Sequence, residues 1–218
     1  DVAVDSNDAV VTTGSFANTI SYADDSMTSA GQEDIFITKN SADGSVAWWT
    51  NLGGLGEDMG YGVAIDSDDD VIVAGSSSYT TDAGSDSVTS VGGTDVFVSK
   101  LNGASGSPVW AVGFGSTKDD KALDVAVDSF DGSIVVVGEY RGGVEFGDST
   151  LSNNGNADFF ISHIDENGAP NWTLGMGGVY NDTAHDAVID GDGNVYVIGT
   201  YQGAVDFGAG TVNSKGLS

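Results

Sequence analysis

Two short segments of the chain place oxygen-bearing side chains at alternate positions. They contain Asp66, Asp68 and Asp70 in the first segment and Asp190, Asp192 and Asn194 in the second. Calcium binds carboxylate, amide and carbonyl oxygens that converge from one loop, so these are the candidate metal ligands and calcium is the candidate cofactor. The alternative is a plain turn, in which Asp and Asn bond to nearby backbone groups. The spacing does not match an EF-hand, which requires a Glu at the end of its loop.

A second acidic feature lies ahead of each predicted first strand. It consists of the pairs Glu57-Asp58, Asp119-Asp120 and Asn181-Asp182. Paired carboxylates can act as general acid and base, as in glycoside hydrolysis, when burial raises one pKa. A catalytic pair is needed once, whereas this feature recurs along the chain. The recurrence therefore predicts side chains that cap loops between repeats rather than catalytic residues.

The other reactive residue types form no recognised catalytic pattern. His163 occupies the repeat position of Lys39 and Lys100, which predicts an exposed strand position rather than a zinc ligand. The chain has no Ser-centred nucleophile motif and no Gly-rich phosphate loop with a Lys. The sequence therefore predicts that the protein is not an enzyme. Two triplets match the N-glycosylation pattern, at Asn181 and at Asn171, and Asn181 lies in the more polar surroundings.

These residues follow an internal repeat. The motif Val-Ala-Val-Asp, or a close variant, ends at Asp5, Asp66, Asp128 and Asp190, at spacings of 61, 62 and 62 residues. Trp49, Trp110 and Trp172 mark the end of each complete copy and predict core packing, with an aromatic ligand platform as the alternative. We divide the chain into repeats 1–61, 62–123 and 124–185 and a partial repeat 186–218, within a single domain 1–218.

Each repeat contains four short extended segments, which in the second copy are 63–66, 71–75, 96–101 and 109–113. Their β-branched, nearly continuous apolar runs indicate strands covered on both faces. No helical period persists, so the predicted class is all-β. Four-stranded repeats of about 62 residues are typical of β-propeller blades, here three complete and one partial. The segments 15–33, 76–94, 139–157 and 200 onward are predicted as long variable loops suited to recognition.

The string Asp-x-Gly-x-Val-x-Val-x-Gly at 190–199, with Asp-Phe-Phe-Ile and a closing Trp within 157–172, resembles the SBBP-type β-propeller repeat. A weaker match extends over residues 1–218. The resemblance implies a seven-bladed propeller architecture and a surface or secreted protein. It implies little about activity, because that repeat occurs in proteins of varied roles and a fold does not fix a function.

The charge of the chain limits its partners. It has 33 acidic and 6 basic residues, a formal net charge of −27. Nucleic acids and anionic membranes are excluded as partners, because both are bound through clusters of Lys and Arg. Such a surface needs screening by salt or divalent cations, which predicts an extracellular or cell-surface location in a saline environment. The chain has no Cys and no apolar stretch long enough to span a membrane.

The favoured hypothesis is a non-catalytic extracellular structural or adhesive module, part of a surface layer or filament. A propeller that binds a glycan, peptide or surface protein through its variable loops is the first alternative, and a propeller hydrolase or lyase is the second. Residues 1–218 supply three four-stranded units and one leftover hairpin, so we expect no closed ring and an unpaired strand edge near Leu217. The missing strands are expected from further repeats of the same polypeptide or from a neighbouring subunit.

Overall fold

The structure is a computed structural model that describes residues 1–22, 25–84 and 86–215. Every regular element among these residues is a β-strand, which confirms the all-β class. The strands fall into four successive units. Units 1 and 2 comprise β1 (Val2–Val4), β2 (Val10–Tyr22), β3 (Asp25–Asn40), β4 (Val46–Gly54), β5 (Met59–Ile65), β6 (Val71–Ala83), β7 (Asp86–Leu101) and β8 (Pro108–Phe114). Units 3 and 4 comprise β9 (Lys121–Val127), β10 (Ile134–Tyr140), β11 (Val144–Phe146), β12 (Ser149–Leu151), β13 (Asp158–Ile164), β14 (Pro170–Met176), β15 (Thr183–Ile189), β16 (Val195–Thr200), β17 (Ala204–Asp206) and β18 (Thr211–Asn213).

Within each complete unit, antiparallel neighbours follow the order of the chain. Unit 3 is a four-stranded sheet in the order β14-β13-β10-β9. Units 1 and 2 have the same internal order, and a short pairing of β4 with β6 joins them into one eight-stranded sheet. In unit 4, β15 pairs with β16, and β17 pairs with β18 in a separate hairpin. No sheet closes on itself within the described residues. Leu217 lies outside them.

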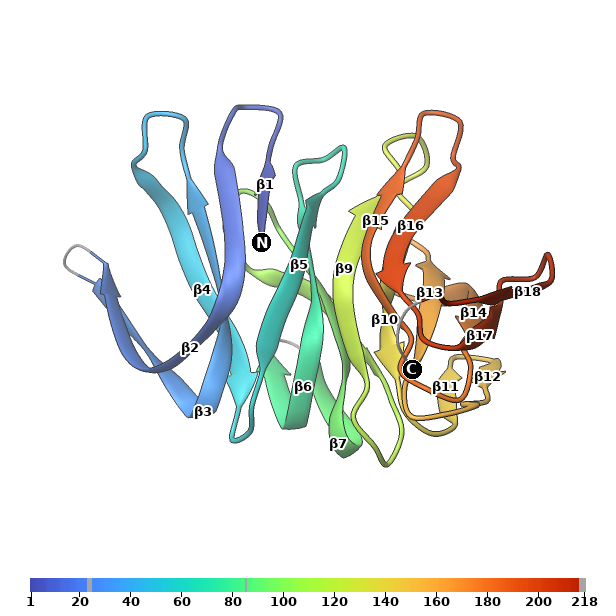
Figure 1. Ribbon diagram of the computed structural model, residues 1–218. Helices are drawn as coiled ribbons and strands as arrows, with labels where there is room; N and C mark the ends of the chain where they lie inside the picture. The colour runs from blue at the N-terminus through green and yellow to red at the C-terminus, as the bar shows by residue number, and fades with distance from the viewer. Residues whose placement is uncertain (23–24, 85, 216–218) are drawn as a thin grey trace.

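The units lie side by side, with the first strands β1, β5, β9 and β15 following one another across the molecule (Figure 1). The core lies between units, because each central strand is apolar on both faces. On β7, Val96 and Val98 pack toward unit 3, whereas Phe97 and Leu101 pack toward unit 1. All four of these side chains are buried. The continuous apolar runs in the sequence thus correctly predict strands covered on both sides.

The structure corrects the prediction of long loops between the second and third strands. In units 1 and 2 these segments are strand, because β2 and β3 continue as one hairpin out to Tyr22, and β6 and β7 out to Ala83. A bulge lies at the same repeat position in both, where Asn18 and Tyr79 have φ of 63° and 59°. Hydrogen-bonded Thr pairs across the two strands stabilise these hairpins. Because the paired residues are polar, the hairpins contain no apolar run that would predict strand. In units 3 and 4 the segment instead contains a separate short hairpin.

The repeat boundaries also differ from the predicted ones. The first strands of units 2, 3 and 4 begin three residues before the predicted starts of their repeats, at Met59, Lys121 and Thr183 rather than at 62, 124 and 186. The added residues precede an irregularity in the pairing of β5 with β6 and of β15 with β16. They mix apolar residues with polar residues and Gly, so no continuous apolar run marks them as strand.

Candidate functional site

One buried Asp caps the loop between each unit and the next. These residues are Asp58, Asp120 and Asp182, each 0% exposed. Asp120 shows the arrangement: its Oδ2 accepts the N–H of Ser116 at 2.7 Å, and its Oδ1 accepts the N–H of Arg141 from the following unit at 2.7 Å. Asp182 accepts the equivalent N–H groups of Gly178 and Gln202. The prediction that this recurring acid caps loops between repeats is therefore confirmed.

A second buried Asp lies on the third strand of each complete unit, beside the first. These are Asp34, Asp95 and Asp158. The backbone brings the two acids together, since the N–H of each capping Asp donates to the carbonyl of the residue just before the third-strand Asp. Asp158 Oδ2 accepts the N–H of Asn154 at 2.7 Å. Its Oδ1, like that of Asp34 and Asp95, is buried and accepts no hydrogen bond from the described residues. A side chain at Gly177 would overlap the Asp158 carboxylate, so this position requires Gly.

Burial dominates the electrostatics of these pairs. Loss of hydration is the largest cause of the raised pKa of Asp120, which is about 6, and the neighbouring charge of Asp95 acts in the same direction. Burial also raises the pKa of Asp58, Asp95 and Asp158, against the bonds that these carboxyls accept. The pairs are closed to solvent and recur in every complete unit. The observed role of the capping Asp residues is to accept hydrogen bonds from backbone N–H groups of two successive units.

The acids predicted to bind calcium in unit 2 are held by protein donors. Asp66 Oδ1 accepts the N–H groups of Asp68 and Asp70 at 2.9 and 3.0 Å, and its Oδ2 lies 2.7 Å from Lys100 Nζ. Asp70 Oδ1 accepts the N–H of Gly103 at 2.9 Å, and its Oδ2 lies 3.5 Å from Lys100 Nζ. Asp68 contributes its backbone N–H to this turn.

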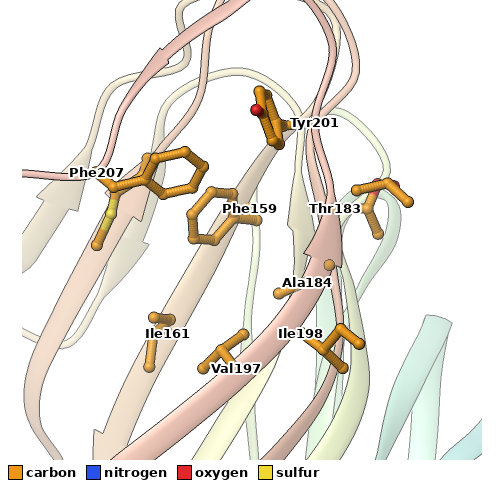
Figure 2. A pocket seen from close by; sticks show the side chains of 11 residues that line it. Phe159, Ile161, Thr183, Ala184, Val197, Ile198, Tyr201 and Phe207 are labelled. Atoms are coloured by element: carbon orange, nitrogen blue, oxygen red, sulfur yellow. The ribbon is translucent and has the colours of Figure 1, made fainter. Parts of the chain in front are cut away.

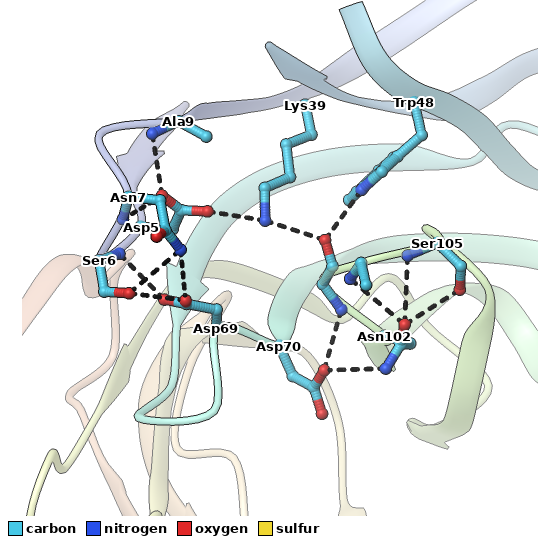
Figure 3. Close-up of polar contacts among 12 residues, drawn as sticks. Asp5, Ser6, Asn7, Ala9, Lys39, Trp48, Asp69, Asp70, Asn102 and Ser105 are labelled. Atoms are coloured by element: carbon cyan, nitrogen blue, oxygen red, sulfur yellow. Dashed lines mark hydrogen bonds and ion pairs between the residues drawn. The ribbon is translucent and has the colours of Figure 1, made fainter. Parts of the chain in front are cut away.

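The equivalent turn of unit 1 has the same ion pair and adds links to unit 2 (Figure 3). Lys39 Nζ lies 2.7 Å from Asp5 Oδ2 and donates to the carbonyl of Gly103 at 2.9 Å. The bond to Lys39 is the largest cause of the lowered pKa of Asp5. The carboxylate of Asp69 accepts the N–H and the hydroxyl of Ser6. These turn acids therefore connect neighbouring units, and the position of Lys39, predicted to be exposed, is buried.

The predicted ligands of unit 4 form a turn closed by Asp190. Asp190 Oδ1 accepts the N–H groups of Asp192 and Asn194, and Oδ2 accepts the hydroxyl of Tyr196 at 3.0 Å. The side-chain bond from Asn194, with these further bonds, lowers the pKa of Asp190 to about 2. Within residues 1–22, 25–84 and 86–215, no three acidic, His or Cys side chains converge closely enough to hold a metal ion. Calcium at either turn stays a prediction.

Two Asp residues at the first strands, Asp1 just before β1 and Asp124 within β9, were not among the predicted functional residues. Asp1 Oδ2 accepts the N–H of Val63 at 2.9 Å, and Asp124 Oδ2 accepts the N–H of Ala187 at 2.8 Å, so each joins two first strands. Burial, and then the nearby Asp186 carboxyl, raises the pKa of Asp124. The signal for these acids is their shared place immediately before the repeated Val-Ala-Val-Asp motif.

The structure corrects the repeat position of the first Trp. Trp48, not Trp49, is equivalent to Trp110 and Trp172, because Trp48 pairs with Lys39 as Trp110 pairs with Lys100. Each indole N–H reaches into the next unit, from Trp48 to the carbonyl of Gly103 and from Trp110 to that of Glu166, both at 3.0 Å. Because residues 48 and 49 are both Trp, the sequence does not show which of them is equivalent to Trp110. The strand pairing shows that it is Trp48.

Both predicted glycosylation acceptors, Asn181 and Asn171, are exposed. Asn171 Nδ2 lies 3.3 Å from Nδ1 of His163, and the His163 ring stacks on Trp172 at 5.2 Å between centroids. Thr173, the last residue of its triplet, is buried and shares a hydrogen bond with Ser162, whereas Thr183 bonds to Glu139. Access to the backbone around Asn171 is thus the more restricted of the two.

Comparison of the chain with protein-family models and with curated proteins gave no match. Across the described residues, no helix has the length and apolar character to cross a membrane.

Proposed function

We propose that the protein is a non-catalytic structural or adhesive repeat module that acts outside the cell or on its surface, with its four-stranded units arranged as blades of a β-propeller. The observation that carries this proposal is the recurrence of the buried Asp pair in every complete unit. An enzyme concentrates its acids at one accessible place, whereas here they hold loops between like units. The SBBP-type resemblance and the net charge of −27 support the extracellular location.

A binding module is the second candidate, and the long hairpins of units 1 and 2 favour it. Tyr22, at the end of β2, and Tyr79, at the bulge of β6, are 52% and 67% exposed. Exposed Tyr on a hairpin offers a large contact area at low entropic cost, as in many protein interfaces. A glycan or peptide is the partner that these side chains would contact.

One set of experiments separates these functions. The purified protein is applied to glycan and peptide arrays and is tested against polysaccharides and peptides for cleavage. A structural or adhesive module predicts no turnover, and no saturable binding that depends on Tyr22 and Tyr79. Binding that is saturable and lost in the double variant Tyr22→Ser and Tyr79→Ser would establish the binding module instead. Turnover that is lost in Asp124→Asn would establish an enzyme, because Asp124 and Asp186 are the partly accessible acid pair in the described residues.

A further inference from the structure

Strand β16 of unit 4 has an open edge. In unit 3 the equivalent strand, β10, lies between β9 and β13 and pairs with both. Within the described part of the chain, β16 pairs with β15 alone. The backbone N–H and C=O groups on its other side are therefore available to an extended segment.

A Gly on β16 marks the register that such a segment would take. In each complete unit a Gly of the second strand is paired with a Phe of the third. The pairs are Gly14 with Phe36, Gly75 with Phe97 and Gly138 with Phe160. In unit 1 the ring covers the Gly, since a Cβ placed at Gly14 would lie 2.7 Å from the ring of Phe36. In the other units a Cβ at the Gly would instead overlap the backbone of the first strand, at Met59 for Gly75, Lys121 for Gly138 and Thr183 for Gly199. Gly199 holds this position in β16 and pairs with Ala184 on its other side.

A cavity of about 430 Å³ lies beside Gly199 (Figure 2). Its lining includes Ala184, Val197, Tyr201 and Phe207 from unit 4. The equivalent residues of unit 3 are Ala122, Val136, Tyr140 and Phe146, and all of them belong to the core cluster that contains Phe160. The Phe146 and Phe160 rings lie 4.9 Å apart. The cavity thus reproduces the surroundings of Phe160 without the ring.

The wall that unit 3 contributes is also preformed. Phe159 and Ile161 line the cavity, and Phe159 lies 5.9 Å from Phe207 between ring centroids. Tyr196 and Ile198 of β16 are 58% and 67% exposed, and Ile198 is also among the residues that line the cavity. Their equivalents in unit 3 are fully buried against unit 4. Both faces of β16 are therefore apolar, as they are on a central strand that lies between two neighbouring units.

We propose that β16 and this cavity bind the third strand of a like repeat. The occupant is an extended segment with the chemistry of Asp158–Ile161, namely Asp, an apolar residue, Phe and an apolar residue. It runs antiparallel to β16 with its Phe opposite Gly199. Main-chain bonds to β16 provide affinity, and the aromatic cavity provides specificity. This inference deepens the proposed structural function and rests on its premise that these units stack with like units.

A peptide tests the cavity. A fluorescent peptide with the sequence of residues 157–176 is titrated into the whole protein, and its anisotropy is measured. We expect saturable binding that weakens roughly tenfold or more when the peptide carries Phe160→Ala, because the ring loses its burial. The protein variant Val197→Lys should also weaken binding, whereas Val188→Lys, on the opposite face of the same two-stranded sheet, should not. No saturable binding, or equal binding of the two peptides, would overturn the proposal whether or not Val197→Lys folds.

A cross-link tests the register. The chain has no Cys, so Ile198→Cys introduces a single thiol. Val137 pairs with Ile161 in unit 3, which places position 161 of the bound peptide opposite Ile198. A peptide with Ile161→Cys should form a disulfide with this variant several-fold faster than one with Phe159→Cys. Equal rates would show that the peptide binds without the proposed register and would contradict the inference.

Sedimentation of the free protein tests a second copy as the occupant. Self-association that the peptide cannot displace would assign the edge to another copy and overturn the proposal. Failure of the peptide to bind would leave the results of the array and cleavage tests unchanged, so the inference and the proposed function can fail separately.

Discussion

The two ends of each unit use Asp in opposite ways. At the turns between first and second strands, Asp5 and Asp190 bond to a Lys or to amide groups, and the pKa of each is lowered. At the crossovers between units, Asp58 and Asp120 are fully buried, and the pKa of each is raised. The comparison shows that burial outweighs several accepted hydrogen bonds at the crossovers. At the turns the hydrogen bonds dominate, because Asp5, although buried, bonds to the Lys39 cation and Asp190 is partly exposed. The residue is Asp in every case, and its surroundings decide whether its pKa is raised or lowered.

The largest loss of stability is expected from removing one of the buried Asp residues that cap the loops between units. Asp120→Ala leaves the buried N–H groups of Ser116 and Arg141 without their acceptor, which should cost roughly 3 kcal/mol of unfolding free energy. Asp120→Asn retains one acceptor oxygen and should cost less. The control is Asp131→Ala, which removes an exposed acid that bonds only to Ser133 within the described residues. Urea denaturation measures all three, and equal losses for Asp120→Ala and Asp131→Ala would contradict this account.

Breaking a turn ion pair should have the next largest effect. Lys100→Met leaves Asp66 and Asp70 without their cation and should cost roughly 2 kcal/mol. Burial alone would lower the pKa of Lys100, but the bond to Asp66 and the charges of both acids outweigh it and raise that pKa. The matched control, Lys118→Met, removes an exposed Lys. If both variants melt at the same temperature, the turn ion pair is not stabilising.

The pH dependence of the unfolding free energy should reflect both the Asp residues with a raised pKa and those with a lowered pKa. A raised pKa in the folded state means that the folded protein holds more protons, so stability rises as the pH falls from above 6 toward about 4. Below that range, the lowered pKa of Asp5 and Asp190 acts in the opposite direction, and stability falls. Thermal unfolding at constant ionic strength should therefore give a maximum on the acidic side of neutrality. Asp120→Asn should flatten the rise, and a stability that falls steadily from pH 7 would refute this assignment.

Calcium at the turns should have the smallest effect. Weak binding to the folded protein alone adds about 0.4 kcal/mol when the free calcium concentration equals the dissociation constant. Millimolar calcium should raise the melting temperature above that in sodium chloride of equal ionic strength, and the double variant Asp68→Ala and Asp192→Ala, which alters both turns, should remove the difference. A melting temperature unchanged by calcium would exclude the predicted sites.

The sequence predicted the class and the repeat well and the partners of individual side chains poorly. The β-branched runs and the spacing of the Val-Ala-Val-Asp motif report local preference and burial, which are properties of neighbouring residues. The long hairpins of units 1 and 2 escaped prediction because polar cross-strand pairs form them. The repeat position of Trp48 escaped it because two adjacent Trp residues fit the same pattern.

The sequence by itself determined that the protein is built from repeated four-stranded β units, since strand formation and turn chemistry are encoded within a few residues. Only the tertiary structure decided which acids are buried and which meet a cation. Asp58 and Asp66 are eight positions apart and look alike in the sequence. One is enclosed between two units and the other meets Lys100 across a sheet, and both environments are created by residues distant in the chain. Desolvation and charge pairing depend on which residues are close in space. They can therefore be assigned to particular Asp residues only from the structure, in which the units are stacked.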